Sequence, residues 1–169
     1  MNKLKTVVII PCYNCERTIQ EVVKNTQKYC DNIIVVDDGS QDSSGKNALS
    51  VGASVISLGR NFGAGKATRE GIQAGIQNKF EVFITLDADG SHLPSDIPNL
   101  LDSHIHNKND LTIGDRWTIS KSSELPSSKR TANYFATYLI NTVLSTNITD
   151  VACGFRIFSF NAAKIISTS

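Results

Sequence analysis

Short apolar runs alternate with amphipathic segments along most of the chain. The runs are continuous rather than interrupted at every second position, a pattern typical of strands that are buried on both faces of a parallel sheet. They predict five strands, at residues 4–10, 32–36, 53–58, 83–86 and 111–113. Apolar residues at helical spacing predict helices at residues 16–29, 42–49, 64–76 and from 94 onward. The predicted fold is α/β, a mostly parallel sheet flanked by helices.

Local signals refine the expected ends and faces of these elements. Pro11 lacks the N–H that a central strand donates, so it is expected to end the first strand. Asn14 is the expected N-cap of the first helix. Four apolar residues predict the buried stripe of the helix that begins at Pro94: Ile97, Leu100, Leu101 and Ile105.

The last third of the chain is less regular. Residues 120–128 are polar and rich in serine, which predicts a loop. Residues 131–144 are expected to form a helix, and residues 150–158 a last strand-like segment. The composition does not shift sharply along the chain, and 169 residues with a mass of 18.4 kDa fit one domain. We therefore expect a single domain over residues 1–169.

Composition narrows the classes of partner. Seventeen basic and sixteen acidic residues leave a net charge of +1, so no overall field favours nucleic acid or an anionic membrane surface. Every apolar run is shorter than the roughly 20 residues that a transmembrane helix needs. Cys12 and Cys15 form one CxxC pair without a second pair to complete a zinc site, which indicates reduced thiols and a cytoplasmic protein. Binding must therefore be sought in local sites.

Rings and charged groups follow several of the predicted strands directly. In an open parallel sheet, ligands bind outside the carboxyl ends of the strands, so these residues are expected to converge. They are Pro11, Tyr13, Asp38, Asp87, Asp89 and Arg116. A ring, carboxylates and a cation together predict a site for a nucleotide diphosphate. Each has an ordinary alternative: packing for the tyrosine ring, a turn for Asp38, and a surface ion pair for Arg116.

The acidic pair after residues 83–86 is the centre of this predicted site. Asp87 and Asp89 are separated only by the small residue Ala88, and Gly90 follows. If the backbone leaves the regular pleat here, both carboxylates can turn toward one point, where their combined charge favours a cation. The alternative is a plain turn, because Asp, Gly and Ser are common turn residues.

Two other phosphate-binding motifs fail on spacing. Gly65 and Lys66 resemble the end of a P-loop, but Arg60 stands where that motif needs its first glycine. A dinucleotide-binding fingerprint would need glycine or alanine at position 68, where Thr68 stands. These departures argue against an ordinary ATPase and weaken the case for a dehydrogenase.

Six motifs, in order along nearly the whole chain, resemble family 2 glycosyltransferases of the GT-A fold. They are IIPCYN at 9–14, VVDDGSQD at 35–42, RNFGAGKA at 60–67, LDADGSHLPSDIPNLL at 86–101, GDR at 114–116 and GFRIF at 154–158. KRTAN at 129–133 and Asp150 extend the likeness to the dolichyl- or polyprenyl-phosphate sugar transferase branch. The resemblance implies a Rossmann-like nucleotide-diphospho-sugar transferase, with residues 1–117 for the donor and 118–169 as the start of the acceptor-binding part. Most members continue further, so a C-terminally truncated chain is expected.

The resemblance also implies a role for each matching residue. The nucleotide-sugar contacts would be Pro11, Tyr13, Asp38, Lys66, Ala88 and Arg116. The ligands of Mg²⁺ or Mn²⁺ would be Asp87, Asp89 and Ser91, the last at a position where the family often has glutamine. The catalytic groups would be Asp89, Arg116, Arg130, Arg156 and Asp150. The implied partners are a UDP- or GDP-linked sugar and a lipid-phosphate or saccharide acceptor, with peripheral association at the inner face of the membrane.

Members that resemble this chain invert the anomeric carbon by a single displacement. A lipid phosphate, whose second pKa is about 6, is already anionic and needs positioning by arginine rather than a base. A saccharide hydroxyl needs a carboxylate base, for which Asp150 is the candidate, although it can equally cap a loop or pair with Arg156. Two other classes of protein remain open. One is a nucleotide-binding module without turnover, suggested by Cys15 and Ser91, which stand where the family often has glutamate and glutamine. The other is a nicotinamide oxidoreductase.

Overall fold

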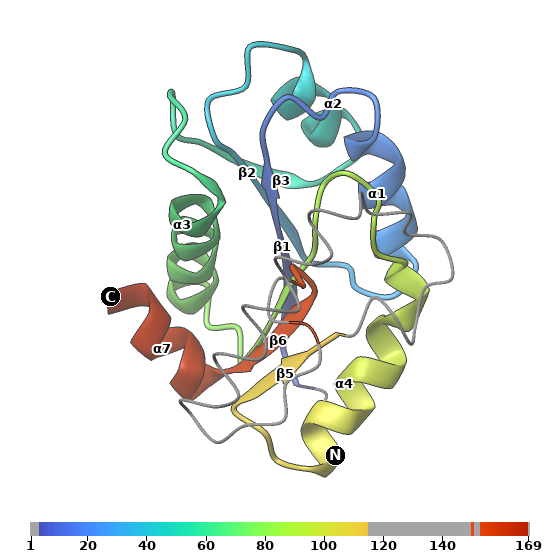
Figure 1. Ribbon diagram of the computed structural model, residues 1–169, viewed down its shortest axis with the longest axis vertical. Coiled ribbons are helices and arrows are strands. Elements are labelled where there is room, and N and C mark those ends of the chain that lie inside the picture. The colour runs from blue at the N-terminus through green and yellow to red at the C-terminus, as the bar shows by residue number, and fades with distance from the viewer. Residues whose placement is uncertain (1–3, 115–149, 151–152, 169) are drawn as a thin grey trace.

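The computed structural model describes residues 4–114, 150 and 153–168. Within this part of the chain, six strands form one sheet in the order β3-β2-β1-β4-β6-β5 (Figure 1). The strands are β1 (Thr6–Cys12), β2 (Ile33–Asp37), β3 (Ser54–Ser57), β4 (Val82–Thr85), β5 (Leu111–Ile113) and β6 (Arg156–Ser159). β1 pairs in parallel with β2 and β4, and β3 continues this parallel half, whereas β6 runs antiparallel between β4 and β5. The predicted mostly parallel α/β fold is confirmed.

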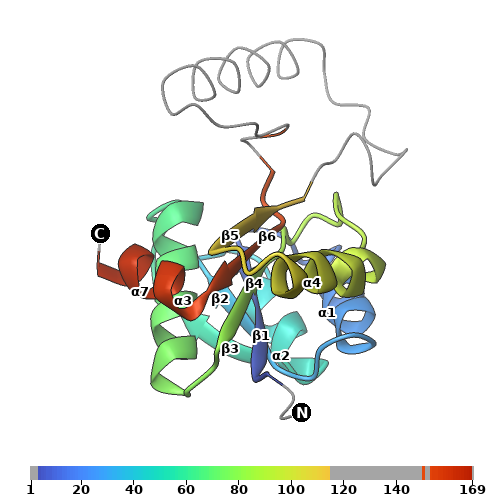
Figure 2. The same ribbon diagram turned by 90° about the horizontal axis from the view of Figure 1, so that it is seen from below.

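Helices cover both faces of the sheet, as Figure 2 shows. One face is covered by α1 (Ile19–Gln27), α2 (Ser44–Ser50) and α4 (Ile97–His106), the last preceded by the short 3-10 helix η1 (Pro94–Asp96). The other face is covered by α3 (Ala64–Gln77) and α7 (Phe160–Thr168). The three central strands β1, β2 and β4 are mostly apolar, because both of their faces are buried.

Small residues bring α3 close to the middle of the sheet. A β-carbon on Gly71 would overlap Ile9, and one on Gly75 would lie 2.8 Å from the ring of Phe83. Ala67 and Ile72, on the same helix, are fully buried. The close packing fixes the first turn of α3 beside the ends of β1 and β4.

Pro11 and Ile105 do not lie where the sequence predicted. Pro11 lies inside β1, paired with Val36, because β4 already ends opposite Ile9 and leaves no ladder bond for a proline N–H to make on that side. Ile105 is 46% exposed. It is rotated by about 80° from Ile97 on the helix, a separation that follows from 3.6 residues per turn.

The face that Ile105 was expected to complete contains His104 instead, which is buried and contacts Thr112 Oγ1 through Nδ1 over 2.9 Å. The end of the chain also differs from the prediction. Among the described residues of the expected strand-like segment at 150–158, only 156–158 lie in β6, which continues to Ser159, and the helix α7 that follows was not predicted. Residues 120–128 and 131–144, expected as a loop and a helix, lie outside the described residues.

No helix in the described part of the chain is long and apolar enough to cross a bilayer. Cys12 and Cys153 are buried thiols of the core. Burial, together with the neighbouring Cys15, raises the pKa of the Cys12 thiol to about 12, so this sulfur stays protonated at neutral pH.

Candidate active site at the carboxyl edge of the sheet

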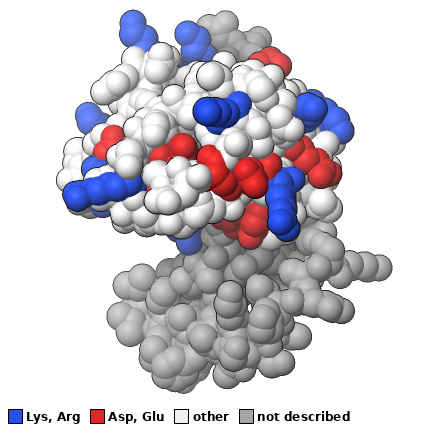
Figure 3. Space-filling view, turned by 90° about the horizontal axis from the view of Figure 1, so that it is seen from above, with Lys and Arg blue, Asp and Glu red and all other residues white. Residues whose placement is uncertain are grey.

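The loops after β1, β2 and β4 emerge at the same edge of the sheet, because these strands are parallel. Asp37 and Asp38 lie at the end of β2, and Asp87 and Asp89 follow β4. Figure 3 looks onto this edge and shows acidic side chains gathered in a band across it, with basic side chains around the band. This edge alone would repel a diphosphate, so a cation would be needed to hold one there.

A hollow of about 310 Å³ opens at this edge, between β1, β4, β6 and the start of α3. Its wall brings together Pro11, Asp87 and Arg156, three residues predicted from the sequence. The other lining residues are Ala64, Gly65, Thr68, Thr85, Gly154 and Phe158. The first turn of α3 therefore faces the hollow, and the N-terminus of a helix favours a negatively charged ligand.

Two neighbours hold the carboxylate of Asp87. His92 donates a hydrogen bond from Nε2 to Asp87 Oδ2 over 3.2 Å. The backbone of Gly154 packs so closely that a β-carbon there would overlap the carboxylate, which explains the glycine in the GFRIF motif. Thr85 fixes this glycine by donating from Oγ1 to its carbonyl oxygen over 2.7 Å. The Asp87 side chain is still 41% exposed and remains accessible to a ligand.

His92 is a site residue to which sequence reasoning gave no role. Its side chain is 5% exposed, and its ring lies 5.7 Å from that of Phe155, with Cys153 Sγ 3.8 Å from Nε2. Burial lowers the pKa of His92, but the hydrogen bonds to Asp87 and Cys153 outweigh this effect and raise the pKa to about 9. The only signal in the sequence was a histidine five residues after the first aspartate.

Asp89 lies in the turn that was the alternative to a metal site. Its Oδ1 accepts the backbone N–H of Ser91 over 2.8 Å, and Gly90 between them has a φ of 78°. The preceding residue, Ala88, is buried, and its carbonyl oxygen accepts a 2.7 Å hydrogen bond from Oγ1 of Thr18 at the start of α1. The turn is therefore tied to α1, a contact that the sequence did not reveal.

The two aspartates line neighbouring but different hollows. Asp87 lines the one described above, whereas Asp89 lines a hollow of about 260 Å³ together with Thr18 and His92. Because Asp89 is exposed, its side chain can rotate away from the turn toward Asp87. A shared cation at both carboxylates stays a prediction that requires this rotation, and the same holds for Ser91 as a ligand.

Asp38 is buried, with 3% of its surface exposed, and both of its oxygens are engaged. Phe62 and Gly63 donate their backbone N–H groups to Oδ1 and Oδ2 over 2.8 and 2.7 Å. Asp38 thus holds the loop that leads into α3. Each carboxylate oxygen has a further lone pair, so the predicted contact between Asp38 and the nucleotide stays a prediction.

The loop that carries Tyr13 is joined to the β2–α2 loop by hydrogen bonds. Asn14 does not cap α1, since the helix begins at Ile19 after Thr18. Instead Asn14 has a φ of 52°, and its Oδ1 accepts the backbone N–H of Gln41 over 2.9 Å. The backbone N–H of Cys15 donates to Ser44 Oγ over 2.7 Å. These bonds leave Tyr13 fixed at the edge with 44% of its surface exposed.

Two predicted cationic residues lie close to the hollow. Arg156 is part of its wall and donates from Nε to the carbonyl oxygen of Cys153 over 2.8 Å. Lys66, on the first turn of α3, pairs with Glu70 over 2.5 Å. Asp150, the candidate base, is fully buried.

The predicted residues Arg116 and Arg130 lie outside the described residues. Their assignments to donor or acceptor phosphates stay predictions. The residues at this edge that the expected strand ends identified lie near the end of β1 or directly after β1, β2 and β4, whereas Lys66 on α3 and Arg156 on β6 were predicted from the family resemblance.

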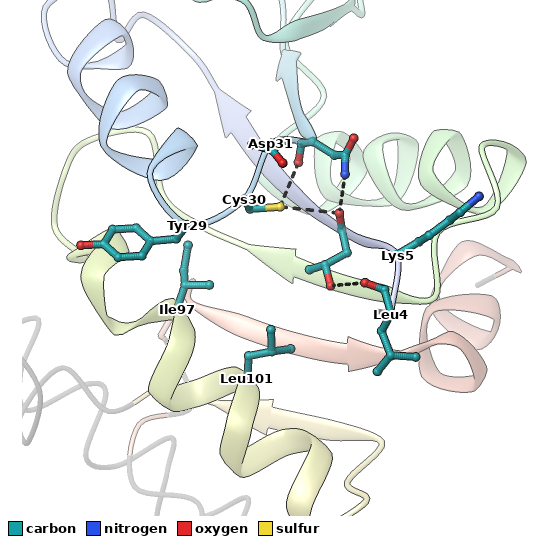
Figure 4. Close-up of a pocket in the computed structure, with 9 residues that line it drawn as sticks. Leu4, Lys5, Tyr29, Cys30, Asp31, Ile97 and Leu101 are labelled. Carbon is teal, nitrogen blue, oxygen red and sulfur yellow. Dashed lines mark hydrogen bonds between the residues drawn. The ribbon is translucent and has the colours of Figure 1, made fainter. Parts of the chain in front are cut away.

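Another hollow, of about 250 Å³, lies at the opposite end of the sheet, at the start of β1 (Figure 4). Two of its polar side chains bond to the backbone of the wall: Asn32 Nδ2 donates to the Thr6 carbonyl oxygen over 3.1 Å, and Cys30 Sγ lies 3.5 Å from the same oxygen. The rest of its wall includes the apolar side chains of Leu4, Ile97 and Leu101. It lies at the amino ends of the parallel strands, away from the edge where open sheets bind ligands.

The carboxylates at the carboxyl edge of the sheet suit Mg²⁺ or Mn²⁺. Hard divalent cations prefer oxygen ligands, and Mg²⁺ is commonly held by one or two carboxylates together with substrate phosphates. Among the described residues, no group of three or more His, Cys, Asp or Glu side chains is arranged to hold a metal by itself. The residues present therefore fit a cation that completes its coordination with a bound diphosphate.

Comparison with known proteins identifies the family. Residues 7–166 match the model of glycosyl transferase family 2, and the chain belongs to this family. It is 31% identical over 179 residues to the UDP-N-acetylglucosamine–dolichyl-phosphate N-acetylglucosaminyltransferase of Methanococcus voltae, covering 95% of this chain and 71% of that protein. It is 32% identical over 179 residues to the polyprenol monophosphomannose synthase of Mycolicibacterium smegmatis, covering 98% of this chain and 65% of that protein.

The fold agrees with this family. The crystal structure of glucosyl-3-phosphoglycerate synthase from Mycobacterium tuberculosis, in complex with Mn²⁺, UDP and phosphoglyceric acid, superposes with a TM-score of 0.66 at 18% identity. The superposition covers 92% of this chain and 56% of that one, so the chain spans a little more than half the length of this structural relative. The predicted membership of the family and its GT-A fold are confirmed, which sets aside a nicotinamide oxidoreductase.

Proposed function

We propose that this protein is an inverting glycosyltransferase that moves a sugar from a nucleotide diphosphate to a polyprenyl phosphate, with Mg²⁺ or Mn²⁺ on the donor diphosphate. The observation that carries the proposal is the hollow in which Asp87, Arg156, Pro11 and the first turn of α3 meet. The curated relatives act, by their names, on dolichyl phosphate and polyprenol phosphate, which supports the same class of acceptor here.

The donor would bind along the carboxyl edge. Tyr13 is exposed beside Pro11 and would stack on the base, while Asp38 would reach the base or ribose through its remaining lone pairs. Asp87 and Asp89 would hold the cation, with the diphosphate supplying the other ligands. When bound, the cation would neutralise the charge that develops on the departing nucleotide diphosphate.

Chain groups other than the acidic pair would hold the remaining phosphate charge. The N-terminus of α3 presents backbone N–H groups to the hollow, and Arg156 lies on another part of its wall. These groups are preorganised: α3 is packed on the sheet through Gly71, and Arg156 is held by the Cys153 carbonyl. They would orient the phosphates so that the acceptor approaches the anomeric carbon from the side opposite the leaving group.

A phosphate acceptor fits the groups at this edge better than a hydroxyl does. A phosphate monoester is anionic at neutral pH and attacks without a base, whereas a hydroxyl needs a carboxylate that can reach it. Asp150 is fully buried, which suits a structural position more than a base that meets a hydroxyl. A lipid-linked acceptor would place the reaction at a membrane surface.

The test is a panel of UDP and GDP sugars measured by thermal shift with and without Mn²⁺, followed by transfer assays. We expect one nucleotide class to raise the Tm only when Mn²⁺ is present, and its sugar to be transferred to a short polyprenyl phosphate but not to the dephosphorylated alcohol. Transfer to a saccharide hydroxyl instead would refute the acceptor. Metal-dependent binding without any transfer would favour a nucleotide-binding module.

A further inference from the structure

His92 differs from an ordinary core histidine in the partner it contacts. Its imidazole is almost fully buried, but the carboxylate it contacts, on Asp87, is 41% exposed and lines the catalytic hollow. By contrast, His104, the other buried histidine among the described residues, contacts Thr112, a residue that lines none of the hollows at the catalytic edge. The hydrogen bond of His92 therefore connects a buried side chain of the core to an exposed carboxylate of the candidate site.

The position of His92 also links two segments that are far apart in the sequence. Its Nε2 lies 3.2 Å from Asp87 Oδ2, after β4, and 3.8 Å from Cys153 Sγ, ahead of β6. Its ring packs against Phe155 in a tilted arrangement with 5.7 Å between centroids. The imidazole thus has few alternative orientations, because a close-packed interior resists rotation of a ring.

The contacts of Asp87 leave its carboxylate with a restricted orientation. Gly154 occupies the space against the carboxylate, so the group cannot turn further toward β6 without a clash. His92 holds Oδ2, and a carboxylate has two oxygens with about four acceptor positions. Oδ1 and one lone pair of Oδ2 therefore remain for another ligand. A neutral imidazole with its proton on Nε2 and an imidazolium make the same bond, so the orientation does not depend on the charge of His92.

We infer that His92 is a positioning residue for the cation of the donor diphosphate. It fixes the Asp87 carboxylate between its own Nε2 and the backbone of Gly154, and the carboxylate in turn would bind the cation. The inference rests on the proposed function, since Asp87 is taken as a ligand. Residues that hydrogen-bond to metal ligands typically change metal affinity about 10- to 100-fold when replaced. A role in packing alone would lower stability and leave metal affinity unchanged.

The test compares two variants of His92 with a matched control. Mn²⁺ is titrated into the protein in the presence of the nucleotide selected by the panel, and binding is followed by the loss of the free Mn²⁺ electron paramagnetic resonance signal. His92→Phe keeps the ring but removes the donor, and we expect Mn²⁺ to bind about 10- to 100-fold more weakly. His92→Gln places an amide N–H near the position of Nε2 and should restore most of the affinity. His104→Phe, the control, should bind Mn²⁺ as the unaltered protein does.

Equal Mn²⁺ affinity for His92→Phe and the unaltered protein would overturn the inference, and so would a failure of His92→Gln to recover affinity. A second measurement without metal separates this inference from the proposed function. We expect His92→Phe to lower the Tm less in an Asp87→Ala background than alone, because the bond it removes is already absent. Additive Tm losses would overturn the inference, whether or not the unaltered protein binds Mn²⁺. Absence of Mn²⁺ binding by the unaltered protein would instead refute the proposed metal site.

Discussion

The substitution Gly154→Ala separates stability from ligand binding at the carboxyl edge of the sheet. The new methyl group would overlap the carboxylate of Asp87, which must then leave the side chain of His92. Gly154 has no left-handed backbone angle, so alanine fits the backbone itself. The effect of the substitution therefore falls on one side chain, and this side chain has open solvent into which it can rotate.

The expected magnitudes follow from these contacts. Overpacking usually costs about 1–3 kcal/mol, and replacing glycine where alanine is tolerated returns about 0.4–1 kcal/mol through the unfolded state. We expect a net loss of about 0.5–2 kcal/mol in the free energy of unfolding, measured by urea denaturation. Affinity for Mn²⁺ with the nucleotide should fall at least about 10-fold, because the displaced carboxylate loses its position.

Gly52→Ala is the matched control for this experiment. Gly52 has a φ of 91°, so alanine strains the backbone there, and the new methyl group would lie 3.3 Å from Gln27 Nε2. Gly52 comes just before β3, at the amino ends of the parallel strands and opposite the acidic pair, so this substitution should destabilise the protein and leave the Mn²⁺ affinity of the folded protein unchanged. If Gly154→Ala binds Mn²⁺ and nucleotide as the unaltered protein does, then Asp87 is not a ligand in the position described.

Three further predictions concern the supports of the site. Thr18→Val removes the hydrogen bond to the Ala88 carbonyl and should cost about 1 kcal/mol in urea denaturation; an unchanged midpoint would show that this bond does not hold the turn. Asn14→Ala and Asn14→Gly both lose the bond to Gln41, but only alanine is strained at a φ of 52°, so Asn14→Ala should unfold at a lower urea concentration. Equal stability of the two variants would show that this backbone angle causes no strain. Burial lowers the pKa of His104 in the folded protein, so the unfolded chain binds more protons and stability falls as pH drops below 6.5; His104→Asn should flatten this dependence, and an unchanged slope would refute it.

The sequence predicted the succession of strands and helices along the chain better than it predicted where each strand ends. Continuous apolar runs identified β1, β2 and β4 most clearly, since strands buried on both faces have few polar residues, and the shorter, partly exposed β3 and β5 were also located. Pro11 was misplaced because strand length depends on where β4 ends, which is a property of the pairing. The antiparallel insertion of β6 between β4 and β5 was beyond reach for the same reason, since pairing between distant segments has no local signal.

Within the site, the sequence identified residues that line the hollow but not the hydrogen bonds that hold them in place. Asp87 and Pro11 were predicted from their places at the ends of the expected strands and Arg156 from the family resemblance, and the fold brings all three to one hollow. The bond of His92 to Asp87 could not be foreseen, since it depends on the path of the turn after β4. Asn14 was assigned to a helix cap by its residue type, whereas its side chain bonds across to a neighbouring loop.

The central claim is that the acidic pair after β4 holds a divalent cation on a nucleotide diphosphate. Isothermal titration of the nucleotide in the presence of Mn²⁺ tests this most directly, with Asp89→Ala compared with the unaltered protein. Asp89 is exposed, and its side chain accepts one hydrogen bond, from Ser91, so its removal should leave the fold intact. We predict that nucleotide binding weakens at least about 10-fold and no longer depends on Mn²⁺. Unchanged Mn²⁺-dependent binding by Asp89→Ala would contradict the claim.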